Sequence, residues 1–219
     1  KEAIANDLLF GAATPATSIV GEDVFGYCQT GPYEYNPERA QELLDEAGVS
    51  NLELNFAAPT GRFLQDFQVA QAVSAYLGAI GINAVPTTSD YGSYVGSLFL
   101  PPEAQTLDMH MFGFAPPGPD AALGMYFISH NSQISPRGLN TAYYDNADYS
   151  ALIDEAFTNS DSEARAEALC DAQQMIWDDA PWLFLHFQDF PIVYRTGLEG
   201  ITYRSGEKFD AIYARPSGS

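Results

Sequence analysis

The chain has few positive charges and no long apolar run. Its 219 residues include 9 Lys and Arg against 29 Asp and Glu, which gives a formal net charge of −20. This shortage of positive charge argues against binding to nucleic acid, whose phosphates require Lys and Arg, and against adhesion to anionic lipid. Because net charge keeps a protein soluble, the acidic composition is typical of an exported or salt-exposed protein.

No apolar segment approaches the ~18 residues that a membrane-spanning helix needs. The most apolar stretch, Ala72–Val85, is interrupted by Ser74, Gly78, Gly81 and Asn83. The sequence shows no signal peptide and no initiator Met, so we expect a processed chain or an excised domain. Hydrophobic residues make up 46% of the chain, which is enough for a folded core and argues against disorder.

Only two cysteines are present, Cys28 and Cys170. They allow one disulfide in an oxidising compartment, but their separation in the sequence gives no indication of contact. Cys170 falls on an expected helix beside Leu169. A buried free thiol is therefore the interpretation that we favour for Cys170, with the disulfide as the alternative.

Motifs for phosphate binding and for nucleophilic catalysis are also missing. There is no G-x-G-x-x-G and no Walker loop, and the segment GSYVG at 92–96 does not place its Ser where a nucleophile elbow requires it. The histidines His110, His130 and His186 do not have metal-ligand spacing. Carboxylates are so numerous that no pair can be singled out for acid–base catalysis. We therefore expect that the protein binds no metal and no cofactor and is not an enzyme.

The segment 107–127 is the strongest candidate for a functional loop. Residues 107–114 alternate between apolar and polar or aromatic side chains, which predicts a strand with His110 as a hydrogen-bonded structural histidine. The prolines of 115–119 cannot continue a sheet, and Asp120 can cap a helix that follows. Loops at strand ends are where α/β proteins tend to bind ligands. An ordinary strand–turn–helix corner is the alternative.

The pattern of the whole chain predicts a single α/β domain over residues 1–219, with a mixed sheet flanked by helices. A long irregular segment is expected over 11–35. Pro86 places the strand at 82–87 near an edge of the sheet, whereas the apolar run 182–187 is typical of a strand covered on both faces. Helices are expected at 1–10, 36–48, 64–81, 90–98, 121–129, 146–157 and 161–180, and further strands at 52–56, 191–196 and 201–204. The residues expected at helix starts are Asn36, Asp90, either Asp148 or Asn146, and either Asp161 or Ser162.

Aromatic residues make up 13% of the chain and gather near the predicted ends of elements, among them Phe112, Phe114, Tyr143 and Tyr144. Such side chains bind small molecules by burying area, although filling of the core is the alternative for each of them. Arg62 follows a strand and a Pro-Thr-Gly turn and precedes a helix. Its guanidinium could grip an anionic group, or it could simply pair with one of the many acids.

Several segments, taken in order, resemble one known family. Residues 35–48, YNPERAQELLDEAG, resemble the Tyr-(Asp/Asn)-Pro-x-x-Ala-x-x-Leu-Leu-x-x-Ala-Gly segment of family 5 extracellular solute-binding proteins. Residues 144–156, YDNADYSALIDEA, and the Ala-Pro-Trp at 180–182 resemble later segments of that family, as do residues 69–81 and 107–120. These proteins are the oligopeptide, dipeptide, glutathione and nickel binding components of ABC importers. The resemblance covers nearly all of the chain.

The resemblance implies a non-catalytic, extracytoplasmic protein, either periplasmic or anchored as a lipoprotein in its full-length form. Family members fold as two lobes of the class II periplasmic-binding-protein type, which close on a ligand. The chain is similar to the C-terminal lobe alone, so the N-terminal lobe and half of the cleft would be missing. The implied partners are a small-molecule or oligopeptide ligand, the ABC permease subunits and the missing lobe, and we expect a monomer.

The resemblance also suggests which residues touch the ligand. Peptide-binding members carry an Asp in the cleft loop that pairs with the ammonium group of the peptide, and residues 112–117 of this chain contain no acid. Arg62 lies close to where dipeptide binders place an Arg that grips a carboxylate. We therefore expect an anionic or neutral ligand. Its expected contacts are Arg62, Phe112, Gly113, Phe114, Tyr143 and Tyr144.

Two rival functions come from other classes of protein. A secreted α/β hydrolase fragment would need a nucleophile with a nearby base, which no motif supplies. A structural adhesion domain would lack a concave cleft with aromatic walls. The shape and lining of any cleft therefore separate a binding protein from an adhesion domain.

Overall fold

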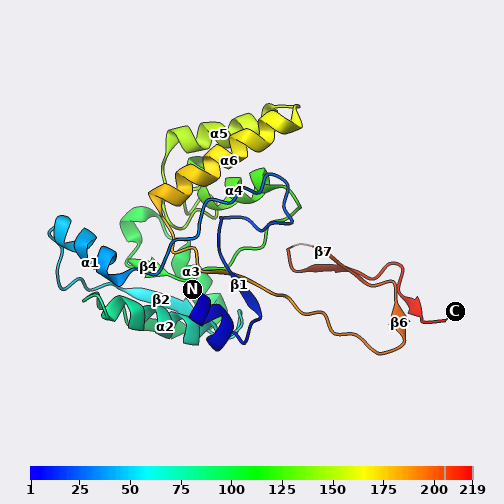
Figure 1. The fold of residues 1–219 in the computed structure, drawn as a ribbon, viewed down its shortest axis with the longest axis horizontal. Coiled ribbons are helices and arrows are strands. Elements are labelled where there is room, and N and C mark those ends of the chain that lie inside the picture. The colour runs from blue at the N-terminus through cyan, green and yellow to red at the C-terminus, as the bar shows by residue number, and fades with distance from the viewer. Residues whose placement is uncertain (205, 219) are drawn as a thin grey trace.

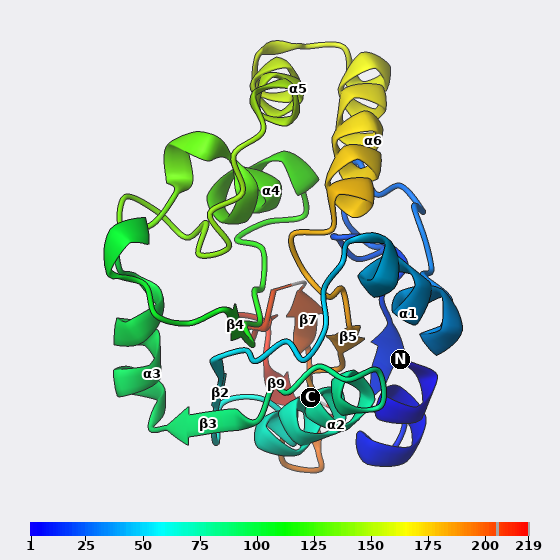
Figure 2. The ribbon, with the colours of Figure 1, turned by 90° about the vertical axis from the view of Figure 1, so that its left-hand side faces the viewer.

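The computed structural model describes residues 1–204 and 206–218 and shows helices at both ends of a small sheet (Figures 1 and 2). The α-helices are α1 (Pro37–Glu46), α2 (Asp66–Gly78), α3 (Tyr91–Leu98), α4 (Ala121–Ser129), α5 (Ala147–Thr158) and α6 (Ser162–Asp179). The strands are β1 (Ala13–Pro15), β2 (Phe56–Pro59), β3 (Pro86–Ser89), β4 (Met109–His110), β5 (His186–Gln188), β6 (Leu198–Glu199), β7 (Thr202–Arg204), β8 (Lys208–Asp210) and β9 (Arg215–Pro216). Shorter helical turns are η1 (Ile4–Leu8), η2 (Pro102–Ala104) and η3 (Asn131–Gln133).

Strand β2 is the centre of a parallel three-stranded sheet with the order β3-β2-β4. All four of its residues are buried. Phe56 and Ala58 point into a core shared with α2, and Ala57 points to the opposite face, where it packs near Tyr94 of α3. This alternation follows from the two-residue period of a strand, and burial on both faces explains the apolar sequence. Strand β3, which begins at Pro86, lies at an edge of the sheet as predicted.

Helices α4, α5 and α6 form a separate layer at the opposite end of the body from β2 and α2 (Figures 1 and 2). Its core contains the buried side chains of Met125, Tyr149, Ile153 and Ile176. The helix starts follow the sequence prediction, because the side chain of Asn146 accepts hydrogen bonds at the start of α5. Asp161 does the same at the start of α6.

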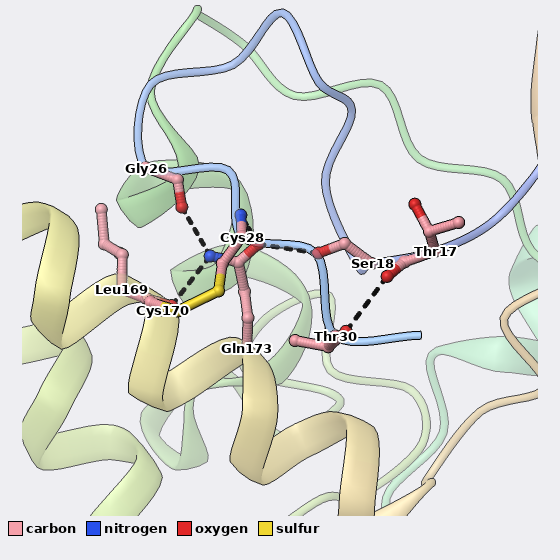
Figure 3. Close-up of a disulfide and its surroundings, with 8 residues drawn as sticks. All are labelled: Thr17, Ser18, Gly26, Cys28, Thr30, Leu169, Cys170 and Gln173. Atoms are coloured by element: carbon pink, nitrogen blue, oxygen red, sulfur yellow. Dashed lines mark hydrogen bonds between the residues drawn. A yellow bond between two sulfur atoms is a disulfide. The ribbon is translucent and has the colours of Figure 1, made fainter. Parts of the chain in front are cut away.

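A disulfide joins the irregular segment 16–35 to α6, and Figure 3 shows its surroundings. Cys28 and Cys170 have a Cα–Cα distance of 5.1 Å. Beside them, the Gln173 side chain donates to the carbonyl of Gly26 at 2.6 Å and accepts from the Ser18 hydroxyl at 2.7 Å. The favoured interpretation of Cys170 as a free thiol is therefore wrong. The distance between the two cysteines in the sequence does not reveal that the segment 16–35 folds back along α6.

Two of the predicted strands are much shorter in the structure, and one is missing. The alternating segment 107–114 forms only the two-residue strand β4. The apolar run at 182–187 contributes only its end to β5, which pairs with β1 in a two-stranded antiparallel sheet. The segment 191–196 contains no strand. In the 182–187 run, Phe184 packs against Trp177 of α6, so apolar side chains here serve a helix contact and not a sheet.

Two parts of the chain bury little apolar surface. Helix α1 starts at the predicted cap, where Asn36 accepts from the backbone N–H of Arg39, but none of its residues is buried and Leu43 is 50% exposed. Residues 190–204 and 206–218 extend from the body as an arm that carries β6 to β9 (Figure 1). Val193 in this arm is 92% exposed.

No helix in residues 1–204 or 206–218 has the length and hydropathy to cross a membrane.

Candidate functional site

A cleft of about 860 Å³ opens between the helical layer and the sheet. Four stretches of chain supply most of its wall: residues 14–24, the turn at 63–66 that leads into α2, the loop 105–116, and residues 181–190. A cleft of this size matches the usual range for small-molecule sites. Its concave form also distinguishes the molecule from the adhesion domain considered above.

The wall of the cleft is rich in aromatic side chains. They come from the sheet side, from the loop 105–116, from the segment after α6 and from the arm. These residues are Phe56, Phe63, Phe112, Phe114, Tyr143, Trp182, Phe184, Phe187, Phe190 and Tyr203. Rings of this kind bury large areas of a ligand, and a Tyr hydroxyl can orient its polar groups.

Contacts with α3 and with Phe63 hold the loop 112–116 in place. The hydroxyl of Tyr94, buried on α3, donates to the carbonyl of Met111, and Phe112 packs against the same helix. Burial raises the pKa of Tyr94, so this hydroxyl keeps its proton. At Gly113, an added Cβ would lie 2.6 Å from the Phe63 ring. The loop and the ring therefore fit together only because residue 113 has no side chain.

The turn that presents Phe63 depends on one buried carboxylate. Asp66 is 4% exposed and accepts backbone N–H groups from Gly61 at 3.2 Å, Arg62 at 2.9 Å and Phe63 at 3.1 Å. It also accepts from Phe67 at 2.9 Å. Such charge-assisted hydrogen bonds fix the backbone of the turn and compensate for the burial of the charge.

Two histidines in the wall have lowered pKa values. His110 lies 2.9 Å from the Thr141 hydroxyl through Nε2, which confirms the prediction of a hydrogen-bonded histidine, and burial lowers its pKa to about 4. Burial also lowers the pKa of His186, whose Nδ1 has no hydrogen-bond partner in the described chain. At pH 7 the His110 imidazole is neutral. No group of three or more His, Cys, Asp or Glu side chains among the described residues is placed to hold a metal ion.

Arg62 lies beside the mouth of the cleft and is already paired. Its guanidinium is 2.8 Å from a carboxylate oxygen of Glu207, in the turn between β7 and β8, and its central carbon lies over the Phe63 ring, 4.8 Å from the ring centre. The hydrogen bond to Glu207 raises the pKa of Arg62. Glu207 belongs to the wall of the cleft, whereas Arg62 does not.

The two neighbouring tyrosines point to different places. Tyr143 lines the cleft and its hydroxyl donates to the carbonyl of Leu100 at 2.9 Å. Tyr144 is outside the lining, and its hydroxyl donates to Asp179 at 2.6 Å. Burial, followed by the hydrogen bond to Asp179, raises the pKa of Tyr144.

Of the six residues predicted to contact a ligand, the structure brings four into one wall. They are Phe112, Gly113, Phe114 and Tyr143. Arg62 and Tyr144 lie outside that wall. Sequence reasoning missed the segments 14–24 and 181–190 as parts of the cleft. Neither has a periodic pattern. The signals were the Gly, Pro and Thr residues of 14–24 and the aromatic residues of 181–190.

Comparison with known proteins places the chain in a family. The profile described as "Bacterial extracellular solute-binding proteins, family 5 Middle" matches residues 1–136. The chain belongs to this family. Members of family 5 are solute-binding proteins that work outside the cytoplasm, and they are not enzymes. This confirms the expected class of protein and gives no support to the hydrolase alternative.

Relatives of known name cover nearly all of the chain. It is 27% identical over 216 residues to the glutathione-binding protein GsiB of Salmonella typhi, a match that spans 96% of this chain and 42% of GsiB. It is also 27% identical over 204 residues to GsiB of Escherichia coli (strain K12), over 91% of this chain and 39% of the relative. The chain therefore spans about two fifths of the length of these relatives.

Solved structures share the fold. NikZ from Campylobacter jejuni, in complex with Ni(L-His), has a TM-score of 0.81 and 21% identity, over 94% of this chain and 43% of NikZ. DppA from Helicobacter pylori, in complex with the peptide STSA, has a TM-score of 0.76 and 23% identity, over 84% of this chain and 35% of DppA. These similarities confirm an α/β fold of the class II periplasmic-binding-protein type.

Proposed function

We propose that the chain is the C-terminal lobe of the solute-binding component of an ABC importer. In this proposal it binds a peptide-like or other small polar solute in a cleft between two lobes. The observation that supports it most directly is the open cleft of about 860 Å³ with aromatic walls, in a chain that belongs to a solute-binding family. The N-terminal lobe of the same protein would supply the opposite wall.

The proposed contacts follow from the lining of the cleft. Phe112, Phe114 and Tyr143 would pack against the solute, and the backbone at Gly113 would come close to it because no side chain intervenes. Arg62 would act from the mouth of the cleft, where a solute group would compete with Glu207. Tyr144 would support the wall behind Tyr143, since its hydroxyl is held by Asp179.

The proposed partners are the solute, the permease subunits of the importer and the N-terminal lobe, with the complete protein a monomer. Names of similar proteins support this class of ligand, because they include a glutathione-binding protein, a protein in complex with a peptide and a protein in complex with Ni(L-His). The proposed location is the periplasm or, with a lipid anchor on the complete protein, the outer face of the cell membrane.

A thermal-shift screen of the complete, two-lobe protein tests the proposal. The panel contains peptides, glutathione, sugars and nickel–histidine chelates. A bound solute present at 100 times its Kd adds about 2.7 kcal/mol to the free energy of unfolding, which raises the melting temperature by a few degrees. Phe114→Ala is expected to abolish the shift. Phe10→Ala is the control, because Phe10 is 78% exposed and lies outside the cleft.

Two outcomes of the screen would contradict the proposal. If no compound in the panel shifts the melting temperature, the binding proposal fails, and turnover of an ester or a peptide would then favour an enzyme. If a shift survives Phe114→Ala unchanged, the solute binds elsewhere and the proposed cleft is not its site.

A further inference from the structure

The charged side chains in the wall of the cleft are acidic. Among the described residues, the lining contains no Lys or Arg, and its acids are Glu22, Asp23, Asp66, Asp108 and Glu207. Asp66 and Asp108 are committed to backbone N–H groups, Asp108 through a 2.7 Å hydrogen bond from Asn55. The imidazole of His110, which lines the same wall, is neutral at pH 7 because burial lowers its pKa to about 4. The wall therefore offers a dissolved anion little compensation for its lost hydration.

Arg62 contacts two residues of this wall, Phe63 and Glu207, and its charge is already balanced. The central carbon of its guanidinium lies 4.8 Å from the centre of the Phe63 ring and 5.9 Å from the centre of the Tyr91 ring, while its Nη2 bonds to Glu207. Both side chains of the ion pair are about one-third exposed. At short range the Glu207 carboxylate cancels most of the attraction that Arg62 would exert on an anion in the cleft.

The position of Glu207 is set by its neighbours in the β7–β8 turn. An added Cβ at Gly206 would lie 2.4 Å from the carbonyl oxygen of Pro116, so the turn touches the cleft loop through its backbone. Lys208, the other cation at this contact, donates to the carbonyl of Pro117 at 2.7 Å. Its ammonium group therefore helps to dock the turn on the loop and is not part of the cleft lining.

We propose that Glu207 sets the charge preference of the cleft. By occupying Arg62, it makes the cleft favour neutral or cationic solutes that carry an aromatic or apolar group over solutes of net negative charge. The inference rests on the proposed function and deepens it, since it names the class of solute for the same cleft. It departs from the anionic ligand that the position of Arg62 alone suggests. It also separates this chain from glutathione, which has two carboxylates and one ammonium group.

Three probes that share an Ala-Phe core and differ in charge test the inference in the complete protein. They are Ala-Phe amide, which is a cation, N-acetyl-Ala-Phe amide, which is neutral, and N-acetyl-Ala-Phe, which is an anion. Calorimetric titration is expected to show the cation and the neutral probe binding about tenfold more tightly than the anion. Equal or tighter binding of the anion overturns the inference. Binding by none of the three, while another compound of the screen binds, overturns it as well.

The variant Glu207→Gln tests the residue itself. It keeps the size of the side chain and releases Arg62, so the affinity for N-acetyl-Ala-Phe is expected to rise about tenfold while that for the neutral probe stays within about twofold. Glu199→Gln is the matched control. Glu199 lies on the same arm and pairs with Arg215 at 2.7 Å, but it is outside the cleft. The control is expected to leave the ratio of the affinities unchanged.

Other outcomes separate a failure of the inference from a failure of the function. If Glu207→Gln changes the affinities for all three probes by the same factor, Glu207 has a structural role only and the inference is wrong. If a solute binds but its charge makes no difference in either protein, the inference fails and the proposed function stands. If no compound of the broad screen binds, the proposed function itself fails.

Discussion

The helical layer and the sheet form opposite walls of the same cleft, but different contacts hold these two walls in place. On the helical side, Gly124, Met125 and Ile128 of α4 line the cleft, and Met125 belongs to the core shared with α5 and α6. On the sheet side, Phe56 of β2 and residues 109–110 of β4 line it from strands of only two to four residues. Strand β2 is buried and shares a core with α2, whereas both residues of β4 are only half-buried.

Beside its core, the sheet side is held by individual hydrogen bonds between side chains and the backbone. Asp66 fixes the turn at 61–63, Tyr94 holds the carbonyl of Met111, and Asp108 accepts from the N–H of Asn55. The helical side is fixed instead by its core and by the Cys28–Cys170 disulfide. We therefore expect a change on the helical side to release a whole segment of the wall, and a change on the sheet side to act locally.

Removal of the disulfide is expected to have the largest effect. The two cysteines are 142 residues apart, and the chain-entropy model gives about 5 kcal/mol for a loop of that length. Urea unfolding of the complete protein, followed by the fluorescence of Trp177 and Trp182, measures the loss on adding dithiothreitol. The double variant Cys28→Ser, Cys170→Ser is the control, since its midpoint is expected to be low and insensitive to the reductant. An unchanged midpoint for the reduced wild type would contradict the role assigned to this cross-link.

Acidification is expected to have the next largest effect, through His110 on the sheet side. The pKa of this side chain is about 4 in the fold against 6.5 in an exposed histidine, so between these pH values the unfolded chain binds more protons. The free energy of unfolding therefore falls as the pH falls from about 6.5 to 4, by at most about 3 kcal/mol for this group.

His110→Gln isolates this contribution, because the amide can still hydrogen-bond with Thr141 and does not titrate in this range. Carboxylates titrate alike in both proteins. Unfolding at pH 7 and at pH 4 is expected to show a smaller loss of stability in the variant than in the wild type. The same loss in both proteins would show that protonation of His110 costs nothing in the fold.

The sequence predicted the parts of the fold that local chemistry decides. Asn36, Asp90, Asp120, Asn146 and Asp161 each accept a backbone N–H at a helix start where a capping residue was expected. Capping depends on residues within three positions of each other, so it can be recognised without a structure. Strand length is different, because a strand extends only as far as a neighbour pairs with it. Segment 107–114 has the alternation of a strand but pairs over two residues.

The same difference between local and remote signals explains why only part of the site could be predicted. Phe112, Gly113 and Phe114 were found because a strand and a proline-rich loop mark them locally. The pairing of Arg62 with Glu207 joins residues 145 positions apart, and nothing near either residue in the sequence indicates it. The contact of Cys28 with Cys170 is equally remote. Such contacts depend on how whole elements pack, which neither spacing nor periodicity reports.

The smallest expected effect concerns one glycine on the sheet side. In Gly113→Ala the new methyl group would meet the Phe63 ring at 2.6 Å, so the ring or the loop must move. Overpacking of this kind costs about 1–3 kcal/mol. Gly118→Ala is a matched control in the same loop, because an added Cβ at Gly118 meets no atom within 4 Å. Thermal unfolding of the complete protein is expected to show a loss for the first variant and almost none for the second.

Gly113→Ala also tests whether the sheet side responds locally. Because Phe63 belongs to the cleft wall, a displaced ring is expected to weaken binding of the solute found in the screen, while the helical core stays intact. Near-ultraviolet circular dichroism of Trp177 and Trp182 reports on that second condition, since Trp177 lies on α6 and Trp182 packs against the helical core. If the tryptophan signal changes together with the affinity, the two sides of the cleft are coupled, and the distinction between a cross-linked side and a locally bonded side does not hold.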